Sequence, residues 1–146
     1  MKLDELLAEF SGVDPEEALE ALIDFSESLP PLSQSRSGIE FPAECRIQEC
    51  QTPVYLWVDL IGDKVHLEAS VPEKSPTVRG FVALLVEGLS GGSPTEIAEV
   101  SDDLLPRLGL SETLGMTRRQ GFRGILQRIK RETALKRQQA AASGGT

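Results

Sequence analysis

The clearest pattern in the chain is a strict alternation of apolar and polar positions between residues 54 and 71. Apolar residues hold every second position on both sides of Gly62-Asp63, namely Val54, Leu56, Val58 and Leu60 before it and Val65, Leu67, Ala69 and Val71 after it. A period of two is typical of strands that have one face in water, and Gly-Asp suits a tight turn. The sequence therefore predicts an antiparallel β-hairpin with one apolar face.

Two helices are expected before this hairpin. Apolar residues at helical spacing over 3–10 indicate a short opening helix. Asp14-Pro15 starts a second helix, because Asp is a good cap and Pro is tolerated in the first turn, and Pro30-Pro31 ends it. The segment 30–44 is rich in Pro, Ser and Gly, as loops are, and it leads into a short strand expected over 44–50 that ends at a turn.

Three more helices are expected after the hairpin. Apolar residues cover most of the circumference over 75–89, which predicts the central buried helix. A capping box at 93–96 starts a short helix, and the final helix begins near Thr117. Helices that come before and after a small antiparallel sheet in the sequence predict an α+β domain whose helices pack on one face of the sheet. We expect a single domain over 1–139 and a disordered tail over 140–146.

Charge is distributed unevenly along the chain, whose net charge is −8. Residues 1–112 contain 7 Lys or Arg and 22 Asp or Glu, whereas residues 113–146 contain 8 and 1. The acidic body disfavours nucleic-acid and anionic-membrane partners. The basic last helix could be a nucleic-acid arm, but pairing with the acidic body and the helix dipole explain it better. Its cations that we expect to point mostly outward are Arg123, Arg128, Lys130 and Arg131.

The N-terminus has neither the basic start nor the apolar run of a secretory signal, and no window approaches the length of a membrane span. The sequence therefore predicts a cytoplasmic protein with no membrane partner. In that compartment thiols stay reduced, so each cysteine has to be explained by packing or by reactivity.

Few residue types remain that could carry chemistry. The chain has 2 Cys and 1 His, too few ligands for a closed zinc site, and His66 falls on the polar face of the hairpin. No Ser-His-acid set is visible, and Gly91-Gly92 lacks the Lys of a phosphate-binding loop. Cys45 and Cys50 are left as candidates. The position of Cys50 before Pro53 fits both a plain buried side chain and a thiol held out by a tight loop.

Four segments along the chain form a recognisable set: Leu29-Pro30-Pro31-Leu32, Ile47-Gln48-Glu49-Cys50-Gln51-Thr52-Pro53-Val54, Val78-Arg79-Gly80-Phe81 and Arg118-Arg119-Gln120-Gly121-Phe122. In order and spacing they resemble SufE-type proteins. The most specific is the second, which resembles the acceptor-cysteine motif of that family, in which an aliphatic residue, two further residues and the acceptor Cys precede a Ser or Thr and then Val. The resemblance runs from about Ala18 to Lys130 and implies an α+β fold similar to the IscU scaffold.

The resemblance implies a sulfur acceptor that activates a pyridoxal-phosphate cysteine desulfurase of the SufS type. Sulfur would pass to Cys50 as a persulfide and then to a SufBCD-type scaffold complex that builds iron–sulfur clusters. The cofactor belongs to the partner, so none is expected here, and the chain would be an accessory sulfurtransferase rather than a complete enzyme. SufE and CsdE-like subtypes are not separated, and a homodimer is left open.

Arg118 matches the family's arginine near the acceptor cysteine, where a cation would stabilise thiolate or persulfide. The alternative for Arg118 is an exposed residue at a helix start, where the dipole disfavours a cation. We also expect the loop to shelter Cys50 against apolar neighbours such as Val54, Phe81 and Leu85, because a persulfide in solution would be lost to other thiols.

Three positions depart from the family pattern. Glu49 replaces the usual Gly, and its charge opposes thiolate formation unless Arg46 or Arg118 offsets it. Tyr55 replaces a common Trp. Cys45 replaces the usual Asn, and we expect its side chain to have only a packing role beside the Cys50 segment. The alternatives are a resolving thiol and a second residue that carries the transferred sulfur.

The competing function is a thiol-redox regulatory or protein-interaction module in which Cys45 and Cys50 form a reversible disulfide. That pairing requires a sharp turn of the backbone, and a strand between the two residues would hold their side chains apart.

Overall fold

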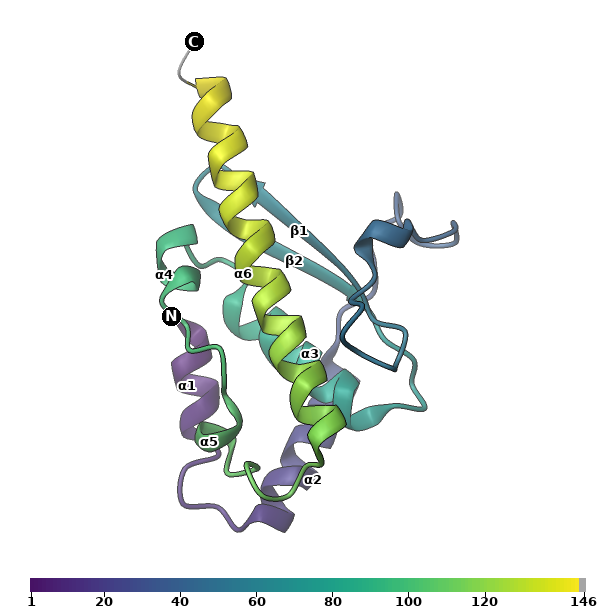
Figure 1. Cartoon of the computed structure of the whole chain (residues 1–146), viewed down its shortest axis with the longest axis vertical. Coiled ribbons are helices and arrows are strands. Elements are labelled where there is room, and N and C mark those ends of the chain that lie inside the picture. Colours follow the sequence, from purple (N-terminus) through teal and green to yellow (C-terminus); the bar gives the residue numbers. More distant parts are fainter. Residues whose placement is uncertain (145–146) are drawn as a thin grey trace.

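The computed structural model describes residues 1–144, in which a single β-hairpin lies against a set of helices (Figure 1). The strands are β1 (Tyr55–Ile61) and β2 (Lys64–Ser70), and 3-10 turns cover Ser26–Ser28 and Ala43–Cys45. The α-helices are α1 (Lys2–Ala8), α2 (Pro15–Phe25), α3 (Pro76–Leu89), α4 (Pro94–Ala98), α5 (Leu105–Leu108) and α6 (Met116–Gly144). The expected α+β class with a small antiparallel sheet is confirmed.

The hairpin turns at Gly62-Asp63, as predicted. β1 and β2 are antiparallel, with Tyr55 opposite Ser70 and Ile61 opposite Lys64. Gly62 in the turn has a φ of 63°, a conformation that favours glycine. The face with the alternating apolar residues is buried and packs on helices, as the period of two predicted.

The loop before β1 covers part of the other face of the hairpin. Arg36 pairs with both Asp59 and Glu68, and its guanidinium carbon lies 5.4 Å from the centre of the Trp57 ring. The Phe41 ring packs on the same Trp at a centroid distance of 5.3 Å. These contacts hold residues 33–41 against the sheet. They thereby fix the position at which the next segment, which leads to Cys50, begins.

Helix α3 is the central buried helix, as predicted, and lies behind α6 in Figure 1. Two glycines allow the close packing around it: a Cβ at Gly80 would overlap the carbonyl oxygen of Leu22, and one at Gly88 would lie 2.8 Å from Cδ1 of Leu3. On the other side, the Phe81 ring stacks on Phe122 of α6 with centroids 4.1 Å apart. The body of the domain is therefore built around α3.

Two expected elements differ from the structure. The strand predicted over 44–50 is wrong: a 3-10 turn ends at Cys45, and only a single bridge, Arg46 to Tyr55, joins this segment to β1. The final helix continues to Gly144, into the segment expected to be a tail. Residues 145–146 lie outside the described residues, so the tail boundary stays a prediction. Within residues 1–144, no helix has both the length and the apolar character needed to cross a membrane.

Candidate functional site

Cys50 lies in a loop, residues 47–54, that is closed at its base like a hairpin. The backbone N–H of Ile47 donates to the carbonyl of Val54 at 2.9 Å, next to the Arg46–Tyr55 bridge. Inside the loop the N–H of Cys50 donates to the carbonyl of Ile47 at 3.4 Å, which closes a turn. The backbone thus holds Cys50 at the turn, and the thiol itself makes none of these bonds.

Arg128 of α6 fixes the chain where it enters this loop. Its Nη1 donates to the carbonyl of Arg46 at 3.2 Å, and its Nη2 donates to the carbonyl of Glu44. Its Nε donates to Glu132 Oε1 at 3.2 Å, one turn further along the helix. The planar guanidinium can serve all three acceptors at once, so a single side chain anchors the segment before Cys50.

Two glycines of α6 receive the tip of the loop. A Cβ at Gly124 would lie 2.5 Å from Cβ of Glu49, and a Cβ at Gly121 would lie 3.3 Å from Sγ of Cys50. Real Cβ atoms do not approach a neighbour as closely as the first distance, so Glu49 occupies space that only a glycine leaves open. Helix α6 therefore supports the loop at both its base and its tip.

Cys50 is 7% exposed and borders a cavity of about 400 Å³. The cavity lies between the loop and the first turns of α3 and α6. Its lining residues are Cys50, Gln51, Thr52, Lys74, Ser75, Pro76, Thr77, Val78, Thr117, Arg118, Gly121 and Phe122. The thiol is therefore sheltered, on a loop, and next to an opening rather than enclosed in solid core.

Burial is the main influence on the Cys50 thiol and raises its pKa above the ordinary value. The carboxylate of Glu49 raises the pKa further, whereas a backbone hydrogen bond from Thr52 and the charge of Arg46 lower it. The opposition expected between Glu49 and Arg46 is thus present around the sulfur. At neutral pH the resting thiol is mostly protonated, which slows its reaction with chance partners.

Arg118, the second predicted site residue, lines the same cavity from the first turn of α6. Its side chain is exposed and makes no ion pair within residues 1–144. The structure therefore brings Arg118 and Cys50 to one cavity, although the cation that lowers the pKa of Cys50 is Arg46. A role for Arg118 in stabilising a thiolate or persulfide stays a prediction.

Cys45 lies apart from this cavity, at the end of the 3-10 turn, and is half-buried. Burial and the charge of Glu44 raise the pKa of its thiol, and Arg128 lowers it. Both cysteines are free thiols. The packed role expected for Cys45 fits this position, and the paired-disulfide alternative gains no support from it.

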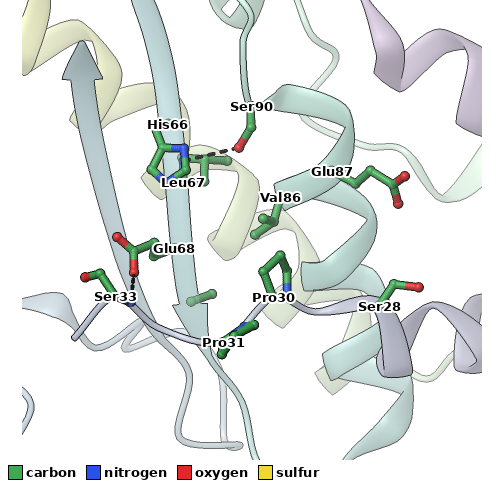
Figure 2. Close-up of a pocket in the computed structure, with 11 residues that line it drawn as sticks. Ser28, Pro30, Pro31, Ser33, His66, Leu67, Glu68, Val86, Glu87 and Ser90 are labelled. Atoms are coloured by element: carbon green, nitrogen blue, oxygen red, sulfur yellow. Dashed lines mark hydrogen bonds between the residues drawn. The ribbon is translucent and has the colours of Figure 1, made fainter. Parts of the chain in front are cut away.

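A larger groove of about 560 Å³ lies elsewhere, between Pro30-Pro31, β2 and the end of α3 (Figure 2). Neither cysteine lines it. Its carboxylates are already engaged: Glu68 accepts from the N–H of Ser33 at 2.6 Å, and Glu87 lies 3.1 Å from Nζ of Lys2. His66 is exposed at its edge, as its place on the polar face predicted. Among the side chains that the structure describes, no three His, Cys, Asp or Glu residues gather as metal ligands would.

Three residues of α6 that support the loop, Gly121, Gly124 and Arg128, were not identified from sequence patterns. Arg128 was expected to point outward, yet its side chain is only 14% exposed because it reaches back to the loop. Gly121 and Gly124 stand three residues apart on the same helix, a spacing that places both on one face. That spacing was the available signal, but it does not say which segment packs there.

Comparison with known proteins gives a consistent result. A family model described as SufE, an Fe-S metabolism associated domain, matches residues 4–133. An uncharacterised SufE-like protein of Mycobacterium tuberculosis is 34% identical over 130 residues, which span 88% of this chain and 89% of that protein. A protein of Plasmodium vivax named cysteine desulfuration protein SufE is 30% identical over 124 residues, spanning 77% of this chain and 51% of that protein.

The fold is also shared with a solved structure. The solution structure of a hypothetical protein from Thermus thermophilus superposes with a TM-score of 0.77 at 32% sequence identity. The match spans 92% of this chain and 95% of that one. Both the sequence and the fold therefore agree over nearly the whole chain.

Proposed function

The chain belongs to the SufE family, and from this premise we propose that it accepts sulfane sulfur on Cys50 from a cysteine desulfurase and passes it to iron–sulfur cluster assembly. The description of the family refers to Fe-S metabolism, and the Plasmodium vivax relative is named for cysteine desulfuration. One observation supports Cys50 as the sulfur-accepting residue: it is a sheltered free thiol on an anchored loop, beside an open cavity.

The proposed transfer is a thiol exchange. The Cys50 thiolate attacks the outer sulfur of a donor persulfide, the donor's sulfur–sulfur bond breaks, and the donor sulfur leaves as a thiolate. Cys50 then carries a persulfide. The rate of this exchange depends on the fraction of Cys50 that is thiolate and on how freely the donor can reach the sulfur. The raised pKa lowers the thiolate fraction, and burial restricts the approach of the donor, until a partner changes the environment of Cys50.

The loop is built to change position locally. Its base is fixed by the Ile47–Val54 hydrogen bond and by Arg128, whereas its tip rests on two glycines through packing alone. Lifting the tip breaks few hydrogen bonds, so a partner that contacts the loop can expose Cys50 without unfolding the domain. Sheltering in the resting state protects the persulfide, and lifting permits transfer.

The partners are proposed at the level of class. We propose a SufS-type desulfurase as donor and a SufBCD-type scaffold complex as recipient, with the pyridoxal cofactor on the donor. A CsdE-like role in a parallel system, a homodimer and a cytoplasmic location all stay predictions.

Desulfurase assays test this function. Adding the protein to a SufS-type desulfurase with cysteine should raise the rate of sulfide release in the presence of a reductant. A Cys50→Ser variant should remove the stimulation and stay folded, while Cys45→Ser, the matched control, should keep most of it. Full stimulation by Cys50→Ser would contradict the proposal.

A further inference from the structure

Every charged side chain that lines the cavity beside Cys50 is a cation. Its lining includes two cations, Lys74 and Arg118, and no Asp or Glu. Both cations are exposed, and neither forms an ion pair within the described part of the chain. Two carboxylates are adjacent in the chain to lining residues, Glu49 next to Cys50 and Glu73 next to Lys74, and neither lines the cavity; Glu49 packs on Gly124.

Two helices begin at this cavity. The first turn of α3, a helix of 14 residues, contributes Pro76, Thr77 and Val78, and the first turn of α6 contributes Thr117 and Arg118. The first amides of a helix lack partners within the helix and carry a partial positive charge. The two helix starts therefore add to the potential of Lys74 and Arg118.

Two hydroxyl side chains also line the cavity at the start of α3. Thr77, in the first turn, is only 6% exposed as a residue. Ser75, at the cap of α3, makes no capping bond with its side chain. A hydroxyl that lines a positive cavity is suited to donate a hydrogen bond to an anion.

We infer that this cavity is an anion site that receives the negatively charged sulfur group of the donor and that it also takes small sulfur oxyanions such as sulfate and thiosulfate. Both a thiolate and a terminal persulfide sulfur are negative, so they repel each other when they meet. Lys74, Arg118 and the Thr77 hydroxyl reduce that repulsion next to Cys50. The role in transfer rests on the function proposed above, whereas anion binding itself does not.

Protection of Cys50 from alkylation measures this binding. The full chain with Cys45→Ser is treated with iodoacetamide, an uncharged reagent, at increasing sulfate concentration and constant ionic strength set with sodium chloride. Sulfate is the probe because it cannot react with the thiol. We expect saturable slowing of alkylation in the Cys45→Ser protein.

Variants assign the effect to the cavity. Lys74→Gln and Thr77→Val should each raise the half-protecting sulfate concentration about three- to tenfold, since each removes one donor to the anion. Lys64→Gln and Thr113→Val, changes of the same kind at exposed sites outside the cavity, should leave it unchanged. Thermal melts check that every variant is folded, and Thr77→Val keeps the shape of the side chain.

Alkylation that sulfate slows no more than chloride does would overturn the inference, as would equal loss of protection in the Lys64 and Thr113 controls. The latter result would mean that sulfate acts by general stabilisation of the protein. Because no desulfurase is present, these outcomes are independent of the function proposed above: persulfide formation without sulfate protection removes only the anion site, and protection without persulfide formation removes only the sulfur-acceptor role.

Discussion

At the scale of residues, the reactivity of Cys50 is set by burial and by two neighbours of opposite charge. Glu49 raises the pKa of the thiol and Arg46 lowers it, while burial is the larger influence. The departure from the family pattern at position 49 thus acts in the direction that its charge predicted. The prediction for Arg118 came from the resemblance and is untested, because its place at the cavity does not by itself define a role.

Glu49→Gln should lower the pKa of Cys50, because it removes a negative charge that favours the neutral thiol. The pH profile of iodoacetamide alkylation should therefore move to lower pH, and the variant should react faster than wild type near neutrality. Gln has nearly the same shape, so its packing on Gly124 is kept. Arg46→Gln should move the profile to higher pH. A shift of both variants in the same direction would contradict this assignment of charges.

At the scale of elements, α6 is both a core helix and the support of the Cys50 loop. The hairpin, α3 and the capping box of α4 were predictable because periodicity and capping are local properties of the sequence. The position of the loop was not, because it depends on contacts between residues about 75 or more apart in the chain, as between Glu49 and Gly124. The strand expected over 44–50 failed for the same reason: Arg128 and the turn at Cys50 replace the sheet hydrogen bonds.

Gly124→Ala should destabilise the protein by about 1–3 kcal/mol, because its Cβ would lie 2.5 Å from Cβ of Glu49 and force the loop tip to move. Denaturant unfolding measures the loss, and faster alkylation of Cys50 reports the displaced loop. Gly115→Ala is the matched control, since a Cβ there meets nothing within 4 Å. In a Glu49→Gly background the cost of Gly124→Ala should disappear. An unchanged cost in that background would show that the two positions do not interact.

Arg128→Gln should loosen the base of the loop by removing the donors to the carbonyls of Glu44 and Arg46. We expect a loss of about 1–3 kcal/mol in the free energy of unfolding and faster alkylation of Cys50. Arg131→Gln, which changes an exposed cation on the same helix, should alter neither quantity. If Arg131→Gln had the same effect as Arg128→Gln, the loss would reflect the charge of α6 rather than the anchor.

At the scale of the whole molecule, the basic helix is matched by the acidic body. Lys130 Nζ lies 2.9 Å from Asp102, and Arg123 Nη2 lies 3.8 Å from Asp103, so part of the positive charge of α6 is paired within the chain. The pairing agrees with the explanation preferred from the sequence, and the absence of a nucleic-acid partner stays a prediction. The cations that line the cavity beside Cys50 take no part in this pairing.

The central claim is that Cys50 is the sulfur-carrying residue, and peptide mass spectrometry tests it most directly. The protein is incubated with a SufS-type desulfurase and cysteine, persulfides are trapped with an alkylating reagent, and the peptides containing Cys45 and Cys50 are compared. We predict one extra sulfur on the Cys50 peptide, none on the Cys45 peptide, and no adduct in Cys50→Ser. Sulfur carried on Cys45, or an adduct that persists in Cys50→Ser, would contradict the account.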